Sequence, residues 1–131
     1  MKRIVALAAL GLAAACTAEG IEPTASEEAA LAGELSGMVA GETRACVPSR
    51  DLRGNRSVGG AIVFEGPGDT IYVNRPDAAC TGIRHGRAIS TRTTSSQLCR
   101  GDIVTIFDPV SGAQFGGCGL GDFTTYRPRG S

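Results

Sequence analysis

The sequence is poor in aromatic, imidazole and lysine side chains. Its 131 residues include no Trp, two Tyr, four Phe and one His, and no Lys follows Lys2. The single histidine, His85, and the absence of any C-x-x-C pair argue against a zinc site, which is usually built from closely spaced Cys and His ligands. We therefore expect neither a metal nor another cofactor. So few aromatic side chains also predict a thin hydrophobic core that needs stabilisation from another source.

A long apolar run is missing as well. Ile4 to Ala15 is an uncharged, mostly aliphatic stretch of 12 residues, whereas a membrane-spanning helix needs about 20. Lys2 and Arg3 before this stretch and the small residues at its end are typical of a secretory signal peptide. We expect residues 1–15 to be a signal peptide and the protein to be exported to the cell envelope.

The end of the apolar stretch, Ala13-Ala14-Ala15-Cys16, resembles the lipobox of bacterial lipoproteins. The family prefers Leu three residues before the cysteine, where this chain has Ala13. The resemblance implies that Cys16 is acylated, becomes the N-terminus and holds the protein on the inner or outer membrane through palmitate-type chains, facing the periplasm. Several acyl chains anchor a protein firmly, whereas one gives only marginal binding. The alternative is ordinary cleavage after Ala15, which leaves Cys16 as a free thiol.

An odd number of cysteines in an exported protein needs an explanation. There are five, and lipidation of Cys16 accounts for the odd one. The other four form an even set, which in an oxidising compartment predicts two disulfides. Two disulfides would also compensate for the thin core, since each contributes about 2–4 kcal/mol to stability. The four predicted disulfide cysteines are Cys46, Cys80, Cys99 and Cys118.

The pairing of these four cysteines stays open between two schemes of three. Cys99 and Cys118 stand at nearly matching positions on the two arms of a hairpin expected after Ile103–Phe107, which favours Cys99–Cys118 and leaves Cys46–Cys80. A nested scheme, Cys80–Cys99 with Cys46–Cys118, would instead join the loops around one strand and tie the two ends of the domain together.

Two parts of opposite charge follow the signal peptide. Residues 17–42 contain six Glu and no basic residue. Residues 43–131 contain eleven Arg against seven Asp and Glu, a net charge of +4. We interpret residues 16–42 as an acidic, lipid-anchored tether and place the start of the folded domain at residue 43.

The tether has room for one short helix. Thr24-x-x-Glu27 has the spacing of a capping box, and the apolar residues from Leu31 onward recur at helical intervals. Gly33 weakens such a helix by about 1 kcal/mol relative to Ala. Two alternatives for Ala25–Ser36 therefore stay open: a marginal helix that is ordered only if its apolar stripe docks, or a bare tether.

From Thr43 onward, apolar residues alternate with the period of β-strands. Short runs rich in β-branched and aromatic residues are separated by turns that contain Gly, Pro and Asp. This pattern predicts an all-β domain, a small antiparallel sandwich or barrel of five to six short strands with two disulfides. The candidate strands are Ala45–Val58, Ala61–Glu65, Thr70–Asn74, Arg87–Thr93 and Ile103–Phe107, the last of which turns back through Asp108–Gly112.

The domain also contains a series of short motifs in a fixed order: Cys46-x3-Arg50-Asp51-Leu52-Arg53, Tyr72-x-Asn74, Cys80-x-Gly82-Ile83, Ser96-Gln97-Leu98-Cys99-x2-Asp102-Ile103-Val104-Thr105 and Cys118-Gly119-Leu120-Gly121-x-Phe123. Together they cover most of residues 46–126 and resemble a family of small exported proteobacterial lipoproteins that has no assigned function. Where some relatives have Pro after the second cysteine, this chain has Thr81. The resemblance implies a common fold and an envelope location, and it brings no catalytic residue.

Arg50, Arg53 and Arg56 recur at every third residue and are the candidate contacts to an anionic partner. Guanidinium groups bind phosphate and carboxylate in a bidentate manner, and the envelope offers lipid phosphates and peptidoglycan carboxylates. The alternative is a solvated basic surface on which arginines pair with nearby carboxylates. We expect no nucleic-acid partner, because the location is unsuitable and no aromatic residues interleave with the basic ones.

Three features that could support catalysis have simpler explanations. His85 lies in a polar loop without a recognisable nucleophile signature. Asp51 and Asp102 could form a carboxylate pair, but ion pairing or turn capping explains both. The glycines of residues 117–121 are followed neither by a helix nor by Lys, as a phosphate loop would be, so we expect tight turns or close backbone approach beside a disulfide. No catalytic residue is predicted.

These observations favour a non-enzymatic binding or structural module in the cell envelope. Its expected partners are the membrane, through the lipid on Cys16, and an envelope protein or an anionic cell-wall component. The alternative is a small envelope enzyme or enzyme inhibitor with an unrecognised site. A cleft that places His85 within hydrogen-bond reach of a carboxylate would favour this alternative.

The lipid anchor gives a direct prediction. Replacing Cys16 by Ser removes the thiol that accepts the diacylglyceryl group, so acylation should be lost and an uncleaved or mislocalised precursor should accumulate. The wild-type protein should partition with membranes and, by intact-mass measurement, begin at an acylated Cys16. An unacylated N-terminus at Cys16 or Thr17 would contradict lipidation.

Overall fold

The computed structural model describes Gly11 and residues 24–76, 80, 82, 83, 86–92 and 95–130. Several sequence predictions lie outside the described residues: the signal peptide apart from Gly11, the lipidation site Cys16, the first part of the tether, and His85. In the part of the chain that is described, no helix combines the length and apolarity required to span a bilayer.

The described chain contains one α-helix, one turn of 3-10 helix and ten strands, all paired in antiparallel ladders. The helices are α1 (Ala25–Glu34) and η1 (Ser49–Asp51). The strands are β1 (Met38–Arg44), β2 (Cys46–Pro48), β3 (Gly54–Val58), β4 (Ala61–Glu65), β5 (Ile71–Asn74), β6 (Ala88–Thr91), β7 (Gln97–Cys99), β8 (Ile103–Phe107), β9 (Gln114–Gly119) and β10 (Phe123–Pro128).

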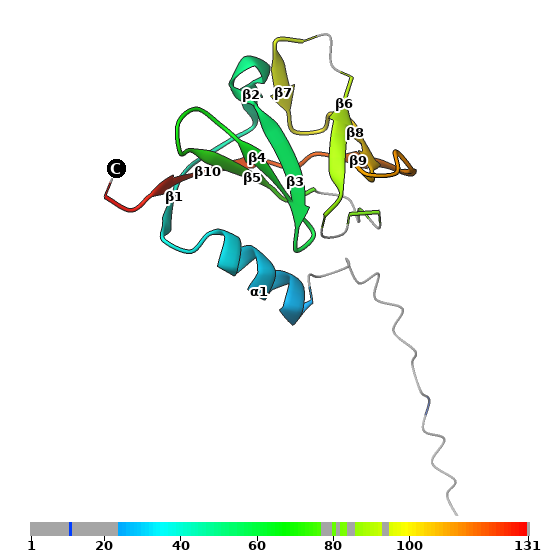
Figure 1. The fold of residues 1–131 in the computed structure, drawn as a ribbon, viewed down its shortest axis with the longest axis horizontal. Coiled ribbons are helices and arrows are strands. Elements are labelled where there is room, and N and C mark those ends of the chain that lie inside the picture. Colours follow the sequence, from blue (N-terminus) through cyan, green and yellow to red (C-terminus); the bar gives the residue numbers. More distant parts are fainter. Residues whose placement is uncertain are drawn as a thin grey trace, which may run out of the picture.

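These elements form three layers around a central five-stranded sheet with the order β1-β10-β5-β4-β3. Helix α1 covers one face of this sheet, and the β2-β7 pair and the β6-β8-β9 sheet pack against the other (Figure 1). The arrangement confirms the predicted antiparallel, sandwich-like all-β domain with two disulfides; it is not a closed barrel. It has more strands than the five or six expected, because several short strands lack a detectable period.

The middle layer explains the continuously apolar residues 61–64. Strand β4 is buried on both faces, and its residues Ala61, Ile62, Val63 and Phe64 are at most 2% exposed. Ile62 and Phe64 face the main core, where the rings of Phe64 and Phe123 lie 5.7 Å apart, whereas Ala61 and Val63 face α1. A strand covered on both sides has no polar face, so its sequence is continuously apolar.

Two asparagine side chains bond to the backbone of other segments of the chain. Asn55 in β3 donates a hydrogen bond to the Ile89 carbonyl (3.1 Å) and accepts one from the Ile89 N–H (2.7 Å), so its amide acts as a strand neighbour for β6. The fully buried Asn74 makes the same pair of bonds with the backbone of Gly121, at 2.7 and 2.9 Å. These amides satisfy backbone groups of β6, an edge strand, and of Gly121, which precedes β10.

Helix α1 is ordered because its first turn and its apolar face both find partners. Thr24 accepts a hydrogen bond from the Glu27 N–H while the Glu27 carboxylate accepts one from the Thr24 N–H, which completes the predicted capping box. Leu31 is 2% exposed and packs with Val58 and its neighbours. The close approach needs Gly59, which has φ +57° and no Cβ to collide with the Glu27 carbonyl. The short helix is therefore confirmed over the bare tether.

The described fold begins earlier than the predicted domain start at residue 43. Strand β1 crosses that boundary and pairs with β10 from Met38 opposite Pro128 to Arg44 opposite Phe123, with an irregularity between Ala40 and Thr43. Most of β1 is exposed because it is an edge strand. Its bulge and its charged side chains are features that protect a sheet edge from pairing with other chains.

The two predicted hairpins are confirmed. β4 and β5 pair across the Gly66–Asp69 turn, and β8 and β9 pair across Asp108–Gly112. In the second turn, Asp108 accepts hydrogen bonds from the N–H groups of Val110 (2.7 Å) and Ser111 (3.2 Å), which lower the pKa of its carboxyl group below the usual value.

Two other predicted strands are present, but they begin and end at different residues. The expected Ala45–Val58 strand is interrupted: it forms β2 and β3 with η1 between them. The Arg87–Thr93 candidate is found as the shorter β6.

Both predicted disulfide schemes are wrong. The structure contains the third pairing, Cys46–Cys99 and Cys80–Cys118, with Cα separations of 4.0 and 5.5 Å. The prediction assumed that the β8 arm continues back to Cys99, but the chain turns at Gly101 (φ +86°), and Cys99 lies in β7 directly opposite Cys46 in β2. The two disulfides indicate an oxidising, exported location.

The docking of α1 through one residue gives a stability prediction. Leu31→Ala should lower the free energy of unfolding by about 2–5 kcal/mol, because it leaves a cavity between the helix and the sheet. Gly33→Ala is the matched control: its Cβ would meet no atom within 4 Å, so better helix propensity should stabilise the protein by about 0.5–1 kcal/mol. Urea unfolding of the oxidised protein measures both. A loss below about 1 kcal/mol for Leu31→Ala would contradict docked packing.

The disulfide pairing gives a second prediction. Proteolysis without reduction should release one linked peptide pair containing Cys46 and Cys99 and another containing Cys80 and Cys118. Replacing both Cys46 and Cys99 by Ser should cost about 2–4 kcal/mol of stability, because the closed loop spans 53 residues. A peptide pair linking Cys99 to Cys118 would contradict the structure.

Candidate functional site

A groove of about 410 Å³ opens on the helix-covered face of the central sheet, beyond the end of α1. Glu34, the last residue of the helix, and Met38 at the start of β1 line one part of it. The start of β3 and the turn between β4 and β5 line another. The groove exists because a helix of ten residues ends before the sheet does. Its size lies within the range of small-ligand sites, about 300–1,000 Å³.

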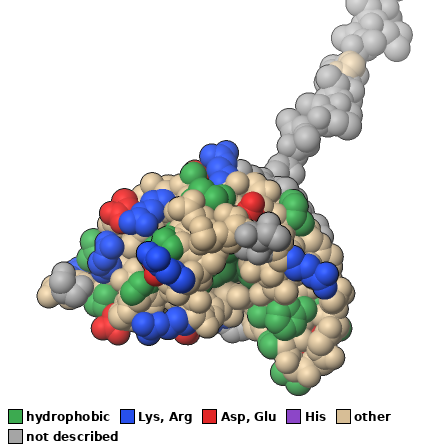
Figure 2. Space-filling model, turned by 90° about the horizontal axis from the view of Figure 1, so that it is seen from above, with side chains coloured by type: hydrophobic (Ala, Val, Ile, Leu, Met, Phe, Trp, Pro, Cys, Tyr) green, Lys and Arg blue, Asp and Glu red, His purple; other side chains and the backbone are tan. Residues whose placement is uncertain are grey.

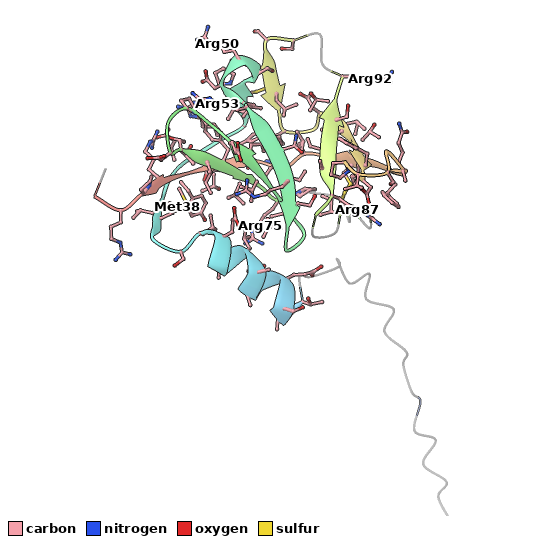
Figure 3. The ribbon with its side chains drawn as sticks, viewed as in Figure 1. Met38, Arg50, Arg53, Arg75, Arg87 and Arg92 are labelled. Carbon is pink, nitrogen blue, oxygen red and sulfur yellow. A yellow bond between two sulfur atoms is a disulfide. The ribbon has the colours of Figure 1, made fainter. Side chains whose placement is uncertain are left out.

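Arg53 supplies the exposed positive charge of the groove. Its backbone N–H donates to the Glu65 carbonyl at 2.9 Å, so the end of β4 fixes the point from which the side chain leaves. The side chain is exposed, and no described carboxylate lies within ion-pair distance of it. Arg53 and Met38 lie on the same side of the molecule, toward which α1 leads (Figure 3). This guanidinium is open to a ligand.

Arg56 lines the same groove but is held by two carboxylates. Its guanidinium contacts Glu34 at the end of α1 and lies 3.2 Å from the Glu65 carboxylate in β4. All three side chains are partly exposed, so each pair contributes about 1 kcal/mol or less. The arrangement connects the end of the helix to the sheet and shapes the groove, and it leaves little of the charge of Arg56 for a ligand.

Asp69 supplies an exposed negative charge from the β4–β5 turn. The turn is closed by hydrogen bonds from the Gly66 N–H to the Thr70 carbonyl (2.9 Å) and from the Thr70 N–H to the Pro67 carbonyl (3.1 Å). Position 66 needs glycine, because a Cβ there would lie 2.8 Å from the Tyr72 ring. Asp69 lines the groove, and no described Arg lies within ion-pair distance of it.

Arg50 does not reach this groove. It belongs to η1, where its Nε lies 3.8 Å from the Asp51 carboxylate, and its side chain is 87% exposed. Figure 3 shows it pointing away from the body of the protein. Arg53 and Arg56 therefore line one groove, whereas Arg50, which lies in η1, does not.

Most other described arginines pair locally. On the face shown in Figure 2, basic side chains are spread out, and several lie beside acidic ones. Arg87 differs, since its guanidinium lies 3.4 Å from the centre of the Phe115 ring and donates to the Gly82 carbonyl. The local ion pairs are Arg44–Glu42, Arg75–Glu28, Arg100–Asp122 and Arg127–Glu42.

The simpler explanations fit the contacts of Asp51, Asp102 and Gly117, whereas His85 lies outside the described residues. Asp51 lies beside Arg50, and Asp102 accepts a hydrogen bond from the Cys99 N–H at 2.8 Å. Gly117 lies in β9, where a Cβ would come within 3.3 Å of the Ile103 side chain and the Val104 carbonyl, a close backbone approach next to the Cys118 disulfide.

Sequence reasoning missed the acidic residues of the groove. The Gly66–Asp69 turn was predicted, and that turn was the only available signal for Asp69. Nothing in the spacing of Glu34 and Glu65 indicates that they share an arginine, since they lie 31 residues apart on different elements. Across the described ranges, no three His, Cys, Asp or Glu residues are grouped so that they could hold a metal ion.

Comparisons of the chain with protein-family models, with curated proteins and with solved structures found no match in any of the three.

Proposed function

We propose that this protein is a lipid-anchored binding module of the bacterial cell envelope, attached through Cys16, and that its groove holds an anionic cell-wall component on Arg53. The lipobox-like end of the apolar stretch supports the anchor. The two disulfides support the exported location, since they persist in oxidising compartments. A cell-wall polymer is within reach of a protein attached to the adjacent membrane.

The observation that carries the binding role is that the exposed Arg53 lines the groove. Arginine has a rigid fork of donors that matches the two oxygens of a carboxylate. Because the Arg53 backbone is bonded to β4, part of the ordering cost of binding is met in the folded state. The neighbouring Arg56 is occupied by Glu34 and Glu65, so Arg53 is the residue we assign to the ligand.

Binding to isolated peptidoglycan sacculi tests this function. Purified protein in detergent should co-sediment with sacculi, and Arg53→Gln should weaken binding by about tenfold, the effect of losing one charge-assisted contact of about 1.5 kcal/mol. Binding of the wild-type protein should also decrease as salt rises, because the contact is exposed.

Arg50→Gln is the matched control for this experiment. It removes the same charge from the same segment of chain, but its side chain lies outside the groove. It should bind like the wild type. If Arg53→Gln binds as well as the wild type, or if both variants lose binding equally, Arg53 is an ordinary solvated surface residue and does not hold the ligand. Stronger co-sedimentation with anionic phospholipid vesicles than with sacculi would move the ligand from the wall to the membrane.

A further inference from the structure

The groove beyond α1 has opposite charges that form no ion pair among the described residues. It is lined by two arginines and three carboxylates, of which Arg56, Glu34 and Glu65 bind one another. This leaves Arg53 as a cation without a described carboxylate partner and Asp69 as a carboxylate without a described arginine partner. A ligand that matches the groove therefore needs a positive group as well as a negative one.

The ion pairs of Arg56 also favour a ligand with a positive group. One guanidinium faces two carboxylates, so Arg56, Glu34 and Glu65 together retain one excess negative charge. The Glu65 carboxylate is held at one oxygen by Arg56 and its side chain is 57% exposed, so it can still accept a hydrogen bond. A purely anionic ligand would meet attraction at Arg53 and repulsion from Glu65 and Asp69, whereas an ammonium group would be attracted to these two residues.

The two charges without a described partner come from separate but fixed positions. Arg53 precedes β3 and is bonded through its backbone to the end of β4, whereas Asp69 belongs to the closed turn that follows β4. Met38 and Ile71 add apolar surface to the groove lining. An elongated ligand with charged ends and a small apolar middle suits such a lining, because its ends are bound by charge and its middle by apolar contact.

We infer that the groove takes a short peptide-like zwitterion, with the ligand carboxylate on Arg53 and its ammonium group on Asp69 and Glu65. This inference rests on the proposed function, to which it adds the second charge of the ligand. A free carboxylate and a free amine occur together at the ends of a short peptide and on wall peptides that retain an amino group, and the two sources share this chemistry.

Three forms of one probe test the inference with the full-length protein in detergent: Ala-Ala-Ala with free ends, its N-acetyl form and its C-terminal amide. Titrations followed by NMR should show amide shifts at residues 53 and 69 with the free peptide. Blocking either end should weaken binding by at least tenfold. Asp69→Asn should weaken binding of the free peptide and leave the N-acetyl form unchanged, while Arg53→Gln should weaken binding of both.

The outcomes separate this inference from the proposed function. If the N-acetyl peptide binds as well as the free peptide and the amide does not, the anion site at Arg53 stands and the zwitterion inference fails. If the amide binds as well as the free peptide, or if no form binds, the inference fails, and the sacculus experiment decides the function alone.

Acetylating the amino groups of sacculi distinguishes the two sources. A loss of binding after acetylation assigns the ammonium group to the wall. Unchanged binding to acetylated sacculi, together with a response to the free peptide, assigns the groove to soluble peptides.

Discussion

Asparagine amides connect backbone segments around the main core, and they favour one relative position of the strands that they join. Asn55 connects β3 to β6 and Asn74 connects β5 to the chain before β10, each through one donated and one accepted hydrogen bond. Each bond contributes about 1 kcal/mol, but a buried amide without its partner would cost about 1–3 kcal/mol. The fully buried Asn74 therefore favours one relative position of the strands over alternatives. This specificity is important where the core contains few aromatic side chains.

Local patterns were predictable from the sequence, and long-range pairing was not. The two hairpins and the capped start of α1 depend on residues close together in the chain, so periodicity and turn chemistry reveal them. β2 and β7 have three residues each and no period, and they pair across some fifty residues. The disulfide prediction failed at this step, because Cys46 and Cys99 face each other only through that pairing. Asn55 and Asn74, in turn, look like ordinary polar residues until their backbone partners are known.

Only part of the candidate site was predictable, because its residues come from segments far apart in the sequence. Arg53 and Arg56 line the same groove, but their spacing does not indicate this, because residues three apart in an extended chain lie on opposite sides of the strand. Arg50 lies in η1 and does not line the groove. The carboxylates come from the end of α1, from β4 and from a turn, so only the packing of three elements brings them to one groove. The balance of positive and negative side chains in such a site cannot be predicted from any one segment of the sequence.

The attachment of α1 also has a mechanical consequence. The helix is held to the sheet by the buried Leu31 and by ion pairs at Glu28 and Glu34, whereas β1 after it is paired along a ladder with β10. A pulling force from the N-terminal side therefore acts on the helix before it reaches the ladder. The ten residues of α1 would lengthen from about 15 Å to about 35 Å when extended. Tension would in that way add about 20 Å of reach and withdraw Glu34 from the groove wall.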